Sequence, residues 1–261
     1  MMPDTLEIGL DILAVLLTGF IILRTFPLMR GEKPMTAALF LFAMTSLLLA
    51  YAYWLAYTLM RPEARMPFAA NEIGEIAVFL LLSATLETVF RESRIDAKRE
   101  MFFAALFASA SVALWIGWTG EWIQDIIGGL AFGYFLCICV RSLKQTDALN
   151  KSEWLALGVS CAVLILGQAG TFLVPAAYKN PLDLFCYAVM FAVLIWLIVK
   201  SILCARKKAG RGAELALSCS AYAFSLSTMY MSADWFYQAA MLLSLITLPL
   251  MLLAVRREVT A

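Results

Sequence analysis

The sequence predicts an all-α, polytopic integral membrane protein: a bundle of nine transmembrane helices in a single membrane domain that covers residues 1–261. Of the 261 residues, 63% are hydrophobic and only 15% are charged. Soluble globular chains have about 45–50% apolar and about 25% charged residues. The apolar residues fall into nine runs, each close to the length of about 20 residues that crosses a bilayer. The loops between the runs are short, which leaves no room for a separate soluble domain.

Each run is bounded by charged or turn-forming residues. Gly117–Gly120 separates the fourth run from the fifth, and Ser232–Asp234 separates the eighth from the ninth. In both cases the combined stretch is too long for one crossing, so we expect two helices joined by a tight turn. The predicted spans cover about 6–28, 35–60, 68–90, 101–118, 121–141, 153–174, 181–204, 213–231 and 234–255.

The basic residues give the predicted orientation. Every odd-numbered run ends in basic charge, and 17 of the 20 Lys and Arg residues fall on the same side of the predicted membrane. Only Arg61, Arg65 and Lys179 fall on the other side. The positive-inside rule then places the N-terminus outside and the C-terminus in the cytoplasm. We expect a plasma membrane of the bacterial inner-membrane type, with the first run retained because acidic rather than basic residues precede it.

The composition also excludes several kinds of chemistry. The chain has no histidine, which excludes His-ligated metals and haem and any His-based proton relay. Its six cysteines lie in apolar runs without a C-x-x-C pair, so they are expected to be small core residues. The H-E-x-x-H, G-x-S-x-G and P-loop patterns do not occur. We therefore expect no cofactor, no metal and no nucleic-acid partner, and a non-enzymatic role is favoured over an enzymatic one. The protein partner and the oligomeric state stay open.

Paired acids at the outer ends of odd-numbered helices are the sharpest local feature. Glu72 and Glu75 are three residues apart, and Glu121 and Asp125 are four apart, so each pair lies on one helix face. Glu7 and Asp11 on the first helix repeat the pattern. We interpret the first two pairs as ligand-binding residues of an outward-facing acidic vestibule, because converging carboxylates hold a proton or a cation between them.

A structural interpretation of the same acids is also open. Acids at helix N-termini are stabilised by the helix dipole, and Arg61 and Arg65 in the adjoining loop are available as ion-pair partners. On the inner side, Glu87 precedes Arg91 by one turn and is expected to pair with it.

Gln168 is the most isolated polar side chain in any run, and glycines flank it at 167 and 170. An amide between two glycines is typical of a locally unwound helix that lines a transporter site. An interhelical hydrogen bond is the more favoured interpretation of the same pattern. We count Gln168 as a fifth candidate ligand-binding residue.

Two further features predict packing. The run at 213–231 is rich in serine and is expected to be shielded from lipid on most of its circumference. Gly129 and Gly133 are expected to lie against a neighbouring helix.

The function that these observations favour is binding or transport of a small solute or cation, with the lipid bilayer as the other partner. The alternatives are a membrane sensor or scaffold subunit that acts through a partner and, less favoured, an intramembrane enzyme acting on lipid.

Overall fold

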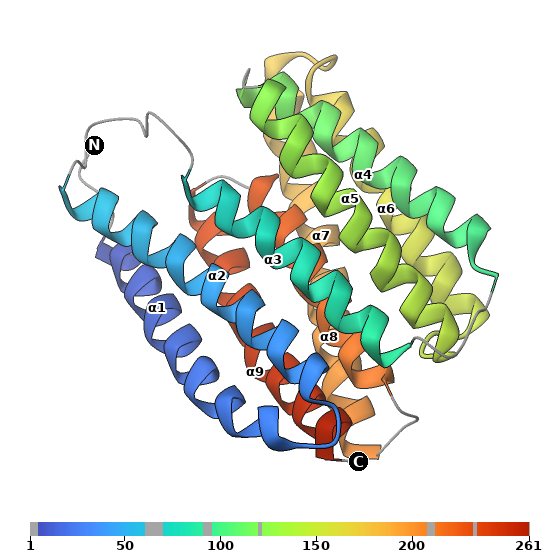
Figure 1. Ribbon diagram of the computed structural model, residues 1–261. Helices are drawn as coiled ribbons and strands as arrows, with labels where there is room; N and C mark the ends of the chain where they lie inside the picture. Colours follow the sequence, from blue (N-terminus) through green and yellow to red (C-terminus); the bar gives the residue numbers. More distant parts are fainter. Residues whose placement is uncertain are drawn as a thin grey trace.

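The computed structural model describes residues 5–60, 70–90, 96–119, 122–207, 212–231 and 234–260. The described residues form nine α-helices and one 3₁₀ helix that run back and forth between two ends of a bundle (Figure 1). In chain order the elements are α1 (Thr5–Thr25), η1 (Phe26–Arg30), α2 (Pro34–Met60), α3 (Ala70–Val89), α4 (Lys98–Thr119), α5 (Trp122–Gln145), α6 (Lys151–Thr171), α7 (Ala176–Lys207), α8 (Ala213–Tyr230) and α9 (Asp234–Thr260).

Seven of these described helices are long and apolar enough to cross a membrane, which indicates a multi-pass membrane protein. They are α1 together with η1, α2, α4, α5, α6, α7 and α9. The all-helical class is therefore as predicted, with a helix at each of the nine expected positions. The other two helices, α3 and α8, do not qualify, because α3 carries three acids, Glu72, Glu75 and Glu87, and α8 is rich in serine.

Several helices extend beyond the predicted spans at the end of the bundle that carries the basic residues. The fifth was expected to stop near residue 141 and ends at Gln145, and the ninth was expected to stop near 255 and ends at Thr260. The added turns hold charged side chains that pair with neighbouring helices. Arg257 contacts Glu214 at 2.6 Å, and Lys144 contacts Glu100 at 2.9 Å. These ion pairs stabilise helical turns that an apolar run alone does not predict.

Helix α8 lies at the centre of the bundle, between α1, α2 and α3 on one side and α4 and α6 on the other (Figure 1). It packs against α9, α7, α5 and α3, and every residue from Ala213 to Thr228 is buried. Ser218 and Ser225 are both fully buried, which confirms the predicted shielding from lipid. Their hydroxyls donate to carbonyls of the preceding turn, at 2.9 and 2.7 Å. A serine-rich helix is therefore accommodated without lipid contact.

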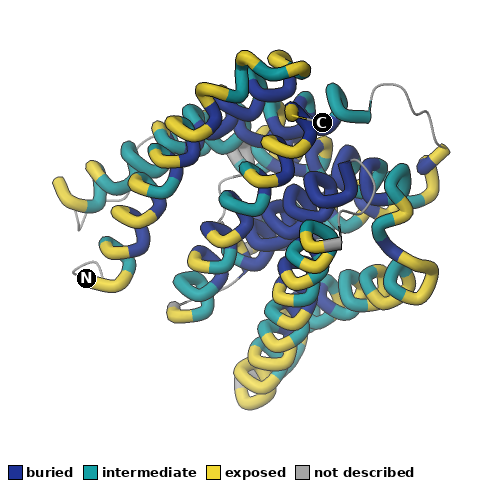
Figure 2. Tube along the Cα trace, turned by 90° about the horizontal axis from the view of Figure 1, so that it is seen from below, coloured by how far each residue is buried: buried dark blue, intermediate teal, exposed yellow. Residues whose placement is uncertain are grey.

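Small residues let α4 and α5 approach closely, as the sequence predicted. A methyl group at Gly133 would lie 3.3 Å from the Cβ atom of Ala108, and one at Gly129 would collide with the side chain of Val112. Close backbone contact of this kind replaces the hydrophobic effect as the source of helix association within lipid. The exposed residues lie on the outward faces of the helices (Figure 2).

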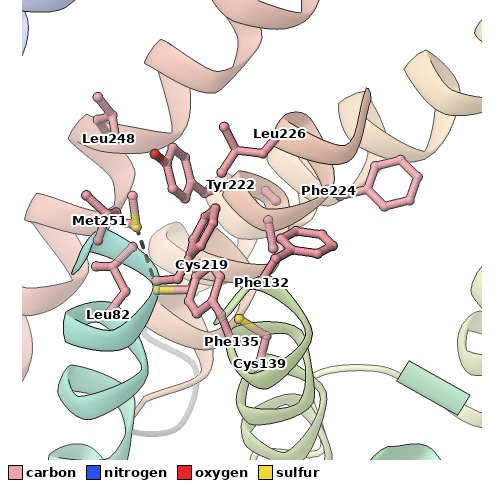
Figure 3. Packing of buried hydrophobic residues seen from close by; sticks show 14 of the residues in the cluster. Leu82, Phe132, Phe135, Cys139, Cys219, Tyr222, Phe224, Leu226, Leu248 and Met251 are labelled. Atoms are coloured by element: carbon pink, nitrogen blue, oxygen red, sulfur yellow. Dashed lines mark hydrogen bonds between the residues drawn. The ribbon is translucent and has the colours of Figure 1, made fainter. Parts of the chain in front are cut away.

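The middle of the bundle is an apolar layer (Figure 3). The side chains of α3, α5, α8 and α9 meet there, and Cys219 and Met251 bring their sulfur atoms to 3.6 Å. The buried residues drawn and labelled in that view are Leu82, Phe132, Phe135, Cys139, Cys219, Tyr222, Phe224, Leu226, Leu248 and Met251. This layer separates the two ends of the bundle. We name them after the predicted orientation: the inner end carries the basic residues, and the outer end lies opposite.

The inner ends are joined by ion pairs between helices. Glu87 pairs with Arg141 of α5 at 2.5 Å, so its observed partner comes from another helix and not from the next turn of its own; the predicted partner Arg91 lies outside the described residues. Glu258 pairs with Lys33 at 3.4 Å and also accepts the backbone N–H of Gly212 at 2.6 Å. Gly212 has φ +80°, a conformation that L-residues rarely adopt.

Candidate cation site in the outer half of the bundle

Close packing of α3 against α2 positions the outer acids. A methyl group at Gly74 would lie 3.0 Å from the Cβ atom of Ala50 and 3.0 Å from the carbonyl oxygen of Ser46. Only a glycine allows the two helices to approach this closely without a shift of one of them. The next residue of α3, Glu75, is thereby held one turn from the outer end of the helix, next to the aromatic residues of α2.

Glu75 is half-buried, and its carboxylate accepts a hydrogen bond from the hydroxyl of Tyr230. Tyr230 lies at the outer end of α8, 155 residues further along the chain. The ring of Tyr230 packs on the indole of Trp115 from α4, with 5.0 Å between the ring centroids. A carboxylate from α3, a phenol from α8 and an indole from α4 therefore meet at one place.

Three more tyrosines lie within electrostatic range of the Glu75 carboxylate: Tyr51 of α2, Tyr222 of α8 and Tyr237 of α9. Tyr51 shares a side-chain hydrogen bond with Ser244 of α9. We call Tyr51, Tyr222, Tyr230 and Tyr237 the tyrosine cluster. It borders the apolar layer of Figure 3, in which the hydroxyl-bearing ring of Tyr222 is drawn.

Asp11 of α1 is the second acid of this region. Its side chain is almost completely buried, with 1% exposure, and its Oδ2 atom has no hydrogen-bond partner among the described residues. Tyr51 and Tyr237 lie within electrostatic range of its carboxylate. A buried carboxylate oxygen without a partner is costly unless something supplies a proton or a positive charge.

The structure brings together three of the five predicted ligand-binding residues. Glu72 and Glu75 lie within electrostatic range of each other, and Asp125 at the start of α5 lies within the same range of Glu72. Glu121, Arg61 and Arg65 lie outside the described residues. Pairing of the acids with the two arginines was one of the interpretations open from the sequence, and it too falls outside the described part of the chain.

Gln168 is placed apart from these acids. It lies near the outer end of α6, a helix that packs on α7 and α4 and makes no extensive contact with α3 within the described ranges. Its side chain is 1% exposed, and the amide nitrogen has no hydrogen-bond partner in the described part of the protein. The predicted interhelical hydrogen bond is therefore not made by this nitrogen.

The tyrosine cluster and the burial of Asp11 are the features that sequence reasoning missed. Asp11 lies outside the two acidic pairs that the sequence led us to interpret as ligand-binding residues. A signal existed in α8: Tyr222 and Tyr230 are eight residues apart and so lie on one face of the helix. No local signal connects that face to Glu75, because the contact joins segments far apart in the chain.

Carboxylates beside aromatic rings form an environment that attracts cations. The carboxylate supplies the opposite charge, and the negative face of each aromatic ring adds a cation–π attraction. Low dielectric surroundings strengthen both interactions. Comparisons of this chain with protein-family models, with curated proteins and with solved structures gave no match.

Proposed function

We propose that this protein is a multi-pass membrane protein that binds a small cationic solute from the outer side, as a transporter or a binding protein. The observation that carries the proposal is the Glu75 carboxylate, which accepts a hydrogen bond from Tyr230 and lies within electrostatic range of three further tyrosines. No Lys or Arg among the described residues forms an ion pair with Glu75 or Asp11. No basic side chain in the described ranges neutralises the negative charge of these two carboxylates.

The binding experiment compares the purified protein with its Glu75→Gln variant in detergent micelles. Thermal unfolding is followed at constant ionic strength while sodium, potassium, calcium and small ammonium ions are added one at a time. At least one cation is expected to raise the unfolding temperature of the parent protein and to leave the Glu75→Gln variant unchanged. Glu87→Gln is the matched control because Glu87 lies on the same helix but pairs with Arg141. Equal stabilisation of all three proteins would contradict the proposal.

The proposal includes nine membrane crossings, with the N-terminus outside and the C-terminus in the cytoplasm of a bacterial-type plasma membrane. Support comes from the basic residues, because the Lys or Arg partners of five described ion pairs all lie at the same end of the bundle. The central position of α8 explains how a serine-rich helix crosses without facing lipid.

Single cysteines in a cysteine-free background test the topology. A membrane-impermeant thiol reagent applied to intact cells should label Lys179→Cys and should not label Asn150→Cys until the cells are opened. Labelling of Asn150→Cys in intact cells would contradict the nine-crossing topology.

A second candidate function is a membrane sensor that acts through a partner. The apolar layer of Figure 3 favours it, because buried apolar side chains fill the middle of the bundle between the cation site and the inner end. Uptake of a labelled cation into vesicles containing the purified protein separates the two candidates. A transporter accumulates the cation, whereas a sensor binds it without uptake.

A further inference from the structure

We propose that the bound cation is an organic ammonium and that Asp11 is its counter-ion, in a site formed by α1, α2 and α9. The inference rests on the proposed function and deepens it by naming the ligand class and by adding Asp11 to Glu75 as a second carboxylate that balances the charge; Tyr51 and Tyr237 lie within electrostatic range of both acids. It starts from the state of the two carboxylates. Glu75 already accepts a hydrogen bond from Tyr230, whereas the Oδ2 atom of Asp11 is buried without a partner in the described structure.

The position of Asp11 in the bundle suits the counter-ion of a bound cation. Helix α1 packs against α2 and α9, and Asp11 is one turn further into the bundle than Glu7 on the same helix face. Glu7 is half-exposed, whereas Asp11 is 1% exposed. A charged carboxylate at that depth needs a hydrogen-bonded opposite charge. No basic side chain of α1, α2 or α9 within the described ranges forms an ion pair with it. The carboxyl therefore either holds a proton or receives a cationic ligand, and our proposal is the cationic ligand.

The neighbours of Asp11 indicate the chemistry of the ligand. The side chains within electrostatic range of it are Tyr51, Tyr237 and Glu7. Tyrosine rings attract ammonium groups through their negative faces. Calcium and magnesium instead prefer six or more oxygen ligands, and no group of three or more Asp, Glu or Cys side chains in the described ranges is placed to hold a metal ion. An ammonium group with alkyl substituents suits one carboxylate with two tyrosines in electrostatic range better than a metal ion does.

The described hydroxyl groups near Asp11 make their hydrogen bonds to groups other than its Oδ2 atom. Tyr51 shares its hydrogen bond with Ser244, and the Ser244 hydroxyl donates to the carbonyl of Met241 at 2.7 Å. The Tyr230 hydroxyl is directed to Glu75. These contacts hold the rings of α2 and α8 in place before a ligand arrives, which lowers the cost of ordering them on binding.

The test is isothermal titration of the full-length protein in detergent with choline, tetramethylammonium, sodium, potassium and calcium at constant ionic strength. The neutral alcohol 3,3-dimethylbutan-1-ol, which has the shape of choline without its charge, is titrated in parallel. We expect choline and tetramethylammonium to bind and the alcohol not to bind. Asp11→Asn should weaken ammonium binding by about tenfold or more, and the matched variant Glu7→Gln should bind as the parent does.

A second variant keeps the test informative if Asp11→Asn does not fold. Asp11→Glu retains the charge and moves it about one methylene further into the site. It should shift the preference from tetramethylammonium towards the smaller methylammonium ion. An unchanged order of preference would overturn the role of Asp11.

The remaining outcomes separate this inference from the proposed function. If only inorganic cations bind and Glu75→Gln abolishes their binding, the ammonium site is wrong and the proposed function stands. If choline binds equally to the parent and to Asp11→Asn, Asp11 is not its counter-ion. If the alcohol binds as well as choline, the site recognises shape and not charge, which also overturns the inference. If none of these cations binds, both proposals are wrong.

Discussion

The outer and inner halves of the bundle hold their acids in opposite ways. At the inner ends, each of five glutamates pairs with a Lys or Arg side chain on another helix or across the chain: Glu87 with Arg141, Glu100 with Lys144, Glu153 with Lys200, Glu214 with Arg257 and Glu258 with Lys33. At the outer ends, the Glu75 carboxylate accepts from a phenol, and one oxygen of Asp11 has no partner among the described residues.

This difference separates the charged side chains that hold helices together from those whose charge a ligand can neutralise. A charge pair that is satisfied within the chain fixes the relative position of two helices and offers little to a ligand. A carboxylate without a basic partner gains from any cation that reaches it. The apolar layer of Figure 3 lies between the halves and keeps the two kinds of charge apart. Each of the following predictions tests whether the halves are separable in this way.

The largest expected effect is stabilisation by the bound cation. At a concentration 100 times the dissociation constant, a ligand that binds only the folded state adds about 2.7 kcal/mol to the free energy of unfolding. This increment should be lost in Glu75→Gln, an outer variant, and kept in Arg257→Met, an inner variant. Chemical denaturation in detergent with and without the cation measures it. Loss of this stabilisation in Arg257→Met would contradict the inference that the outer and inner halves act independently.

A somewhat smaller effect is expected from breaking an inner ion pair. Arg257 donates to Glu214 at 2.6 Å and to the carbonyl of Ala205 at 2.7 Å. Removing it leaves a Glu214 carboxylate that is only 11% exposed. Arg257→Met should lower the free energy of unfolding by about 2 kcal/mol, which is below the cost for a fully buried pair because the Arg257 side chain is half-exposed.

The matched control for this inner pair is Lys98→Met. Lys98 and Asp96 form an ion pair at 3.8 Å in which both side chains are largely exposed. Solvent screens such a pair, so no measurable loss of stability is expected. Equal losses in Arg257→Met and Lys98→Met would contradict a structural role for the inner ion pairs.

Close packing of α3 against α2 at Gly74 stabilises the outer half of the bundle, and an added methyl group tests this contact. Gly74→Ala would place a Cβ atom 3.0 Å from the Ser46 carbonyl oxygen and from the Ala50 Cβ atom. We expect a loss of about 1 kcal/mol or more and weaker cation binding, because α3 carries Glu75. The control is Gly9→Ala, since nothing lies within 4 Å of a Cβ atom at Gly9. That change should slightly stabilise the protein through helix propensity, and a loss in Gly9→Ala as large as in Gly74→Ala would contradict the packing argument.

The smallest expected effect comes from one hydroxyl. Tyr230→Phe removes the hydrogen bond to Glu75 while the ring stays on Trp115. The free energy of unfolding without ligand should fall by about 1 kcal/mol, and the cation affinity should change as well because Glu75 loses its positioning contact. Tyr178→Phe, at an exposed position of α7, is the control and should leave both quantities unchanged. An unchanged affinity in Tyr230→Phe would show that Tyr230 does not position Glu75.

The sequence by itself determined the helices and their positions, because apolar runs of membrane length and the alternation of basic residues are local properties. It also predicted the burial of α8 and the contact of Gly129 and Gly133 with a neighbouring helix, because small and hydroxyl-bearing residues gain nothing from lipid; the structure identifies that helix as α4. Only the tertiary structure decided which polar groups meet. Glu75 meets Tyr230 across 155 residues, and Glu87 meets Arg141 across 54. Helical periodicity gives the face on which a side chain lies, whereas its partner depends on how the described helices pack against one another. That packing is set by the sum of many weak contacts, which no single run of sequence contains.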